Sequence, residues 1–99
     1  MRPLSYSDHL SLGSAIKEFL HAYHLEEKLN QTKLIHSWEK VAGKMVASHT
    51  RDLHVRNKIL FVKVDSPALR NELNFSREKI KKLLNEEVKS EVIEDVVFK

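Results

Sequence analysis

The stretch that decides the fold is RDLHVRNKILFVKVDS, at positions 51–66. Residues of high β-propensity fill it, and the polar pair Asn57-Lys58 interrupts them near the middle, a pattern typical of two antiparallel strands joined by a tight turn. In the second strand Leu60, Val62 and Val64 alternate with Phe61, Lys63 and Asp65, so one face is apolar and the other grades from apolar to charged. The sequence therefore predicts a β-hairpin that needs cover on one face.

Helical spacing of apolar residues surrounds this hairpin. We expect a first helix over 12–23, a second that Asn30 caps and that extends to Ala42, and a third that begins at Pro67 with Ser66 as its cap. Gly43 predicts a bend after the second helix. Ser76 stands where the third helix needs an apolar residue, which predicts a kink over 74–76.

A short apolar run at 92–98 predicts a last strand, so the order is helix, helix, strand, strand, helix, strand. This order indicates an α+β fold in which a three-stranded sheet carries helices mainly on one face, while the strand order stays open. We expect residues 1–10 to form a flexible arm and residues 11–99 a single domain. The predicted core consists of Ile16, Leu20, Leu34, Trp38, Val41, Val55, Leu60, Val62, Val64, Leu73, Ile80, Leu84 and Val96.

Composition narrows the class of protein. The chain has no cysteine, which excludes disulfides and thiolate metal sites and suits the cytoplasm. No segment approaches the ~20 apolar residues that span a bilayer, and the N-terminus lacks the apolar run of a signal peptide. We expect a cytoplasmic protein that does not contact a membrane.

Charge is unevenly distributed along the chain. Residues 51–82 hold nine Lys and Arg against four Asp and Glu, whereas residues 86–95 hold five acids and one Lys. A basic middle before an acidic end favours an anionic partner on one side of the domain.

Signals for catalysis or metal binding are weak. His21 and His24 share a helical spacing, but no further ligand completes a set, so we expect no metal and no cofactor. The sequence has no glycine-flanked nucleophile, no Gly-rich phosphate loop and no carboxylate pair in an apolar setting. A small domain also has little room for an enclosed substrate pocket. We expect neither catalytic residues nor a small-molecule substrate.

Basic residues of the third predicted helix form the strongest candidate site. Arg70, Asn74, Arg77 and Lys81 recur at spacings of four, three and four, which would align three cations on one helix surface. Such a row suits nucleic-acid phosphates, because several cations are needed for appreciable counterion release. The alternative is a solvated helix face. Supporting cations are Lys79, Lys82, Arg56 and Lys58.

Trp38, the only tryptophan, lies in the apolar face of the second predicted helix. Two interpretations stay open: a core residue that buries a large area, or an exposed ring at the edge of the core that contacts a partner or a base.

Several segments together resemble one family. They are WEKVAG at 38–43, VASHT at 46–50, LFVKVDS at 60–66, LRNEL at 69–73 and IKKLLN at 80–85, and in this order they are similar to the DciA family of bacterial replicative-helicase loaders or operators. The likeness extends over residues 12–98. It implies a fold similar to type II K-homology domains, nucleic-acid binding and interaction with the hexameric replicative helicase.

Two departures from these patterns refine the expectation. The basic extension of many members is missing, so the globular part should supply the helicase contact, and no Gly-x-x-Gly backbone clamp follows Gly43. We therefore expect a non-enzymatic DNA-replication accessory that binds single-stranded or duplex DNA electrostatically, with weak sequence preference. An RNA-binding module near the ribosome or transfer RNA, and a pure protein-interaction domain, are the alternatives.

Overall fold

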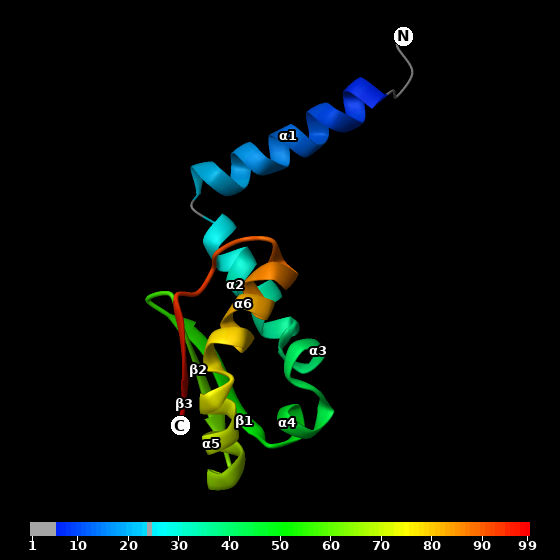
Figure 1. The fold of residues 1–99 in the computed structure, drawn as a ribbon. Coiled ribbons are helices and arrows are strands. Elements are labelled where there is room, and N and C mark those ends of the chain that lie inside the picture. Colours follow the sequence, from blue (N-terminus) through cyan, green and yellow to red (C-terminus); the bar gives the residue numbers. More distant parts are fainter. Residues whose placement is uncertain (1–5, 24) are drawn as a thin grey trace.

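The computed structural model describes residues 6–23 and 25–99, with the side chains of 12–23 and 25–99. Its element order has more helices than the sequence predicts, and Figure 1 shows their arrangement. The elements are α1 (Tyr6–Ala22), α2 (Glu26–His36), α3 (Trp38–Ala42), α4 (Lys44–Ser48), β1 (Thr50–Arg56), β2 (Ile59–Val64), α5 (Pro67–Phe75), α6 (Arg77–Val88) and β3 (Asp95–Phe98). The α+β class and the three-stranded sheet are confirmed.

The hairpin is built on a two-residue turn. Asn57 and Lys58 have φ angles of 51° and 61°, and positive φ at both central residues defines the type I′ turn, whose twist matches that of the two strands. Arg56 then pairs with Ile59, and the antiparallel register continues along β1 and β2. The prediction of a hairpin over 51–66 is confirmed.

The sheet has the order β1-β2-β3, with β3 parallel to β2. Parallel neighbouring strands require a long connection between them. Helices α5 and α6 form this connection between β2 and β3. Figure 1 shows α3, α4 and α6 on one side of the strands. The sheet is therefore mixed, and β2 is its central strand.

The core lies between the inner face of the sheet and these helices. Leu34, Leu60, Leu84 and Val96 are fully inaccessible to solvent. Among the predicted core residues, nine are buried: Leu34, Trp38, Leu60, Val62, Val64, Leu73, Ile80, Leu84 and Val96. Val41 and Val55 are partly buried against them. Four buried residues were not in the predicted core: Val46, Val92, Ile93 and Phe98.

The first helix does not join this core, which corrects the prediction for Ile16 and Leu20. Ile16 is 53% exposed and Leu20 is only half-buried, because α1 projects away from the sheet (Figure 1). The projecting helix makes the molecule elongated, with extents of 64 × 25 × 21 Å. Helix α1 also begins at Tyr6, so it includes half of the predicted arm. The remaining arm residues, 1–5, lie outside the described residues, as does His24.

The second predicted helix is two helices. It begins at Glu26 and not at the proposed cap Asn30, which lies inside α2, and it breaks at Ser37. The Ser37 hydroxyl donates to the Lys33 carbonyl at 2.9 Å, an interaction that competes with the backbone ladder and bends helices. The bend expected at Gly43 is confirmed, since its φ of 95° separates α3 from α4.

The start of the third predicted helix is confirmed, but its kink is a complete break. The Leu69 amide donates to the Ser66 Oγ at 3.3 Å, and Pro67 occupies the first turn of α5. Ser76 then ends α5, and α6 starts at Arg77. The basic residues predicted to share one helix are therefore divided between two.

The last strand is shorter than predicted, because 92–94 form a loop held by Asn85. Its Oδ1 accepts from the Val92 and Ile93 amides at 3.0 and 3.1 Å, and its Nδ2 donates to the Ile93 carbonyl at 2.9 Å. Both loop residues are thereby buried. Helix α6 ends just before, with Lys89 in the left-handed conformation at φ 61°.

Candidate functional site

The predicted basic row on the third helix is broken up in three dimensions. Arg70 is half-buried on α5, whereas Arg77 and Lys81 lie on α6. Arg77 Nε lies 3.5 Å from Asp95 Oδ1, and Lys81 Nζ lies 2.9 Å from Glu78 Oε2. Two of the three cations therefore already have an anionic partner.

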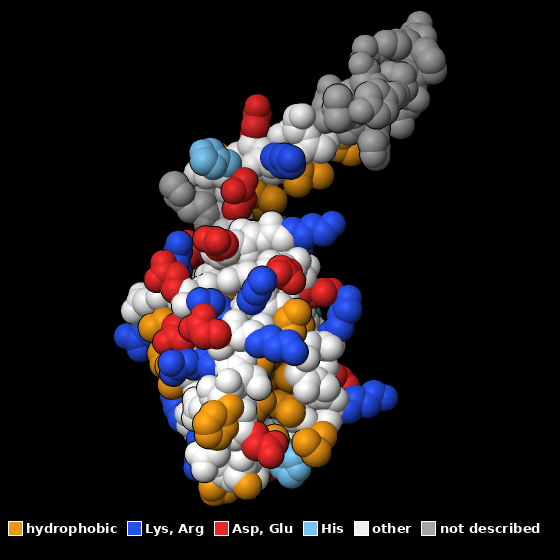
Figure 2. All heavy atoms as spheres, viewed as in Figure 1, with side chains coloured by type: hydrophobic (Ala, Val, Ile, Leu, Met, Phe, Trp, Pro, Cys, Tyr) orange, Lys and Arg blue, Asp and Glu red, His pale blue; other side chains and the backbone are white. Residues whose placement is uncertain are grey.

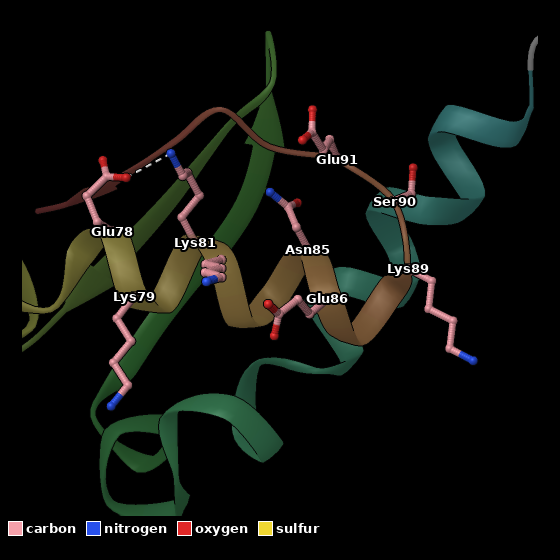
Figure 3. A pocket seen from close by; sticks show the side chains of 9 residues that line it. Glu78, Lys79, Lys81, Asn85, Glu86, Lys89, Ser90 and Glu91 are labelled. Atoms are coloured by element: carbon pink, nitrogen blue, oxygen red, sulfur yellow. Dashed lines mark ion pairs between the residues drawn. The ribbon is translucent and has the colours of Figure 1, made fainter.

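At Lys81 the positive charge of this row is balanced by nearby acidic side chains. The hydrogen bond with Glu78 raises the pKa of the Lys81 ammonium above its ordinary value, with smaller contributions from the charges of Asp95 and Glu91. Figure 3 shows the Lys81 ammonium directed toward Glu78, while Lys79 and Lys89 extend away from it. The α6 cations do not converge on one point.

An open depression of about 930 Å³ lies over this helix and the loop that follows it. Lys79 and Lys82, two of the predicted site residues, line it beside Glu78, Glu86 and Glu91. Figure 2 shows basic and acidic side chains intermingled on this face. Charged side chains of both signs line the depression, and it is open to solvent, unlike the enclosed pockets that bury most of a small molecule.

The hairpin tip lies close to the same region. Lys58 and Lys81 line one depression of about 220 Å³ together with Glu91 and Glu94. Arg56 is exposed at the end of β1. The structure therefore brings the tip cation Lys58 near Lys81 of α6, although the two residues are 23 positions apart in the sequence.

Trp38 is a core residue. Its side chain is 3% exposed, its indole Nε1 donates to Thr50 Oγ1 at 3.0 Å, and its ring centroid lies 6.2 Å from that of Phe98. The structure therefore favours the core interpretation, because a buried ring presents no surface to a partner or a base.

A second candidate surface is the outer sheet face, which points away from the core. Residues alternate along each strand, so Leu60 and Val62 are buried while Ile59, Phe61 and Lys63 face outward. Register then places three rows across the strands. The rows are Arg56-Ile59-Asp95, His54-Phe61-Val97 and Asp52-Lys63-Lys99, where Lys99 extends the ladder through its hydrogen bonds with Val62 and Val64.

An aromatic pair occupies the middle of the outer sheet face. The His54 and Phe61 rings are stacked, with centroids 5.1 Å apart and planes inclined by 16°. The Lys99 ammonium lies 5.2 Å from the Phe61 centroid, within cation–π range. His54 Nδ1 is 2.9 Å from Asp52 Oδ2, a hydrogen bond that lowers the pKa of the Asp52 carboxyl.

Cations surround this pair. Within the described part of the chain no ion pair involves Arg56, Lys63 or Lys99. Of the two acids on the face, Asp52 contacts His54 and Asp95 contacts Arg77. In the outer sheet face, therefore, the aromatic pair lies at the centre, with Lys63 and Lys99 on one side along the strands and Arg56, in the same row as Asp95, on the other.

Sequence reasoning included Arg56 but missed Phe61, His54, Lys63 and Lys99. The pairing of His54 with Phe61 follows from the two-residue turn at Asn57-Lys58. It could therefore have been predicted from the hairpin pattern in the sequence. Val97 and Lys99 required the parallel register of β3, which no local pattern indicates.

Among the residues described, no group of three His, Asp or Glu side chains is close enough to hold a metal ion. Over the same residues, no helix combines the length and apolar character needed to traverse a bilayer.

Comparison with known proteins found one family. The profile described as "Dna[CI] antecedent, DciA" matches residues 11–98. Neither a curated protein nor a solved structure matches significantly, so the expected likeness to K-homology domains stays a prediction.

Proposed function

The chain belongs to the DciA family, a family of accessory DNA-replication factors, and from this membership we propose that it binds nucleic acid and helps the replicative helicase onto DNA. The observation that carries the proposal is the extent of the match, which covers residues 11–98 and hence almost every described element. In this proposal the protein acts in the cytoplasm, without catalysing a reaction itself.

Exposed cations support the nucleic-acid part of the proposal. Basic side chains on the hairpin tip, on α6 and on the outer sheet face present positive charge from several rigid elements. Each phosphate that a cation neutralises releases counterions, so affinity builds from many contacts. The chain lacks a Gly-x-x-Gly backbone clamp, and binding should therefore depend on charge more than on base sequence.

Binding assays at two salt concentrations test this part. We expect labelled oligonucleotides to bind at low salt and to dissociate as salt rises, with a slope of about −0.7 per phosphate contact for single strands. Single-stranded DNA, duplex DNA and structured RNA are compared in parallel. Preference for structured RNA would favour the RNA-module alternative, and no binding in any arm would favour a protein-interaction domain.

The helicase part is tested by co-elution. We expect this protein and a purified hexameric replicative helicase to elute together at low salt, and the helicase to load faster onto a single-stranded circle when the protein is present. Helicase that elutes alone and loads at an unchanged rate would contradict the proposal.

A further inference from the structure

We propose that the outer sheet face binds single-stranded nucleic acid, with bases stacking on the Phe61–His54 pair and phosphates contacting Lys63, Lys99 and Arg56. The inference rests on the proposed function and deepens it, because it names a surface and a strand type. Single-stranded DNA and single-stranded RNA share the chemistry that this surface recognises.

The aromatic pair supports a stacking platform. Phe61 lies on the central strand, directly opposite His54 on β1 and Val97 on β3, so the sheet holds both rings rigidly. Bases stack on aromatic rings largely without regard to sequence. In a duplex the face of each base is covered by the base pairs stacked above and below it, and only an unpaired strand can present base faces to a flat platform.

Lys99 covers part of this platform in the free protein, at 5.2 Å from the Phe61 centroid. An exposed cation–π contact is weaker than a base–aromatic stack. A base can therefore displace the ammonium, which is then free to meet a phosphate of the same strand. The exchange loses little, because the Lys99 charge gains a new anionic partner.

Position and charge favour nucleic acid over a protein as the occupant. Lys63 and Lys99 lie one row from Phe61, and Arg56 lies one row away on the other side, about 7 Å along the strands in each direction. Protein interfaces are depleted of Lys relative to the rest of the surface, whereas two of the three cations beside this pair are Lys. A flat face with cations on both sides of an aromatic pair instead fits a strand whose phosphates alternate with its bases.

The test measures fluorescence anisotropy of labelled 12-nucleotide oligo(dT) and oligo(U) with the full chain at several salt concentrations. Phe61→Leu removes the stack but keeps an apolar side chain, and we expect affinity for both oligonucleotides to fall by about 5- to 150-fold. Phe61→Tyr should restore it. Ile59→Leu, on the same face but outside the aromatic pair, should bind like the parent.

A second pair of variants tests the cations independently of the ring. Lys63→Gln with Lys99→Gln should make the salt slope less steep by about 1.4, since each lost contact contributes about 0.7. Lys79→Gln with Lys82→Gln on α6 removes equal charge away from the sheet and should change the slope less.

The outcomes separate this inference from the proposed function. If the parent binds but Phe61→Leu stays within twofold of it, and the α6 pair flattens the slope more than the sheet pair, the outer sheet face is not the site although nucleic-acid binding stands. If the parent binds no nucleic acid, both proposals fail. Melting temperatures near that of the parent confirm that each variant is folded.

Discussion

The two faces of the sheet consist of alternate residues of the same strands and differ in burial and charge. On the inner face Leu60, Val62 and Val96 are fully buried against the helices. On the outer face Phe61 and Val97, their direct neighbours, are only partly covered, and charged side chains surround them. Because side chains alternate with a period of two, a single strand can stabilise the fold with one set of residues and bind a partner with the other.

The contrast teaches that stability and binding should be separable by position in β2. Inner-face residues contribute burial, which scales with the apolar area removed from water. Outer-face residues contribute rings and charges that remain accessible. Variants of inner-face residues should therefore lower the free energy of unfolding, and variants of outer-face residues should lower the affinity for single strands.

The largest effect is expected at Leu60, which has no exposed surface. Leu60→Ala should lower the free energy of unfolding by about 2–5 kcal/mol, because a cavity adds to the lost burial. Phe61→Ala, one residue along the strand, should cost less stability and more affinity for single strands. Urea denaturation and oligonucleotide binding of both variants measure the contrast, which is broken if Phe61→Ala destabilises as much as Leu60→Ala.

The next largest effect is expected at Asn85, which holds the loop before β3 in the position where Val92 and Ile93 are buried. Asn85→Ala removes the acceptor of the Val92 and Ile93 amides and the donor to the Ile93 carbonyl. Leaving partly buried backbone groups unpaired should cost about 1–3 kcal/mol of unfolding free energy. Thermal melting measures this cost. Asn71→Ala, at an exposed position of α5, is the control and should melt close to the parent.

A smaller effect on binding is expected from the α6 cations. Replacing them tests whether positive charge away from the outer sheet face contributes to nucleic-acid binding. Arg77→Gln with Lys81→Gln removes two cations that already pair with Asp95 and Glu78. Exposed pairs of this kind contribute little to stability, so the free energy of unfolding should hardly change. The salt slope of binding should change less than in the Lys63→Gln, Lys99→Gln variant. An equal or larger change would place the main phosphate contact on α6.

The smallest effect concerns Asp65, which follows β2 and faces outward. His49 Nδ1 lies 2.8 Å from its Oδ1, Arg51 Nε donates to its Oδ2 at 2.7 Å, and these contacts lower the pKa of the Asp65 carboxyl from 3.8. Since the folded pKa is below the unfolded one, this stabilisation is present above pH 3.8 and is lost as pH falls through the folded value.

The matched variant for this prediction is Asp65→Asn. Its melting temperature should be slightly below that of the parent at pH 7, and the two should converge in acid once the pH is below the lowered pKa of the parent carboxyl. A difference that persists or widens in acid would show that the carboxylate charge is not the cause.

Local patterns predicted the hairpin well, because its turn, its alternation and its register all follow from neighbouring residues. Asn57-Lys58 gave the turn, and Ser66-Pro67 gave the start of α5. Helix interruptions were harder. Gly43 was recognised as a break, but Ser37 was not, since its hydroxyl bond back to the Lys33 carbonyl is visible only in the folded structure.

The candidate site was predicted less well than the fold. Helical spacing suggested that Arg70, Arg77 and Lys81 form one row, but the break at Ser76 and the acids Glu78 and Asp95 alter both its geometry and its charge. Asp95 lies 18 positions after Arg77 and meets it only because β3 returns beside β2. A row of cations predicted from the sequence does not show which acidic side chains the fold places beside it.

The sequence by itself determined which faces are apolar, because the period of hydrophobic residues depends only on backbone geometry. It could not determine which apolar face is covered. Helices α1 and α6 both have apolar stripes, yet Ile80 and Leu84 of α6 are buried, whereas Leu12, Ile16 and Phe19 of α1 remain exposed. Figure 2 shows hydrophobic side chains at the surface of that helix. Burial requires a second surface, and only the path of the chain through space brings one to α6 and takes α1 away.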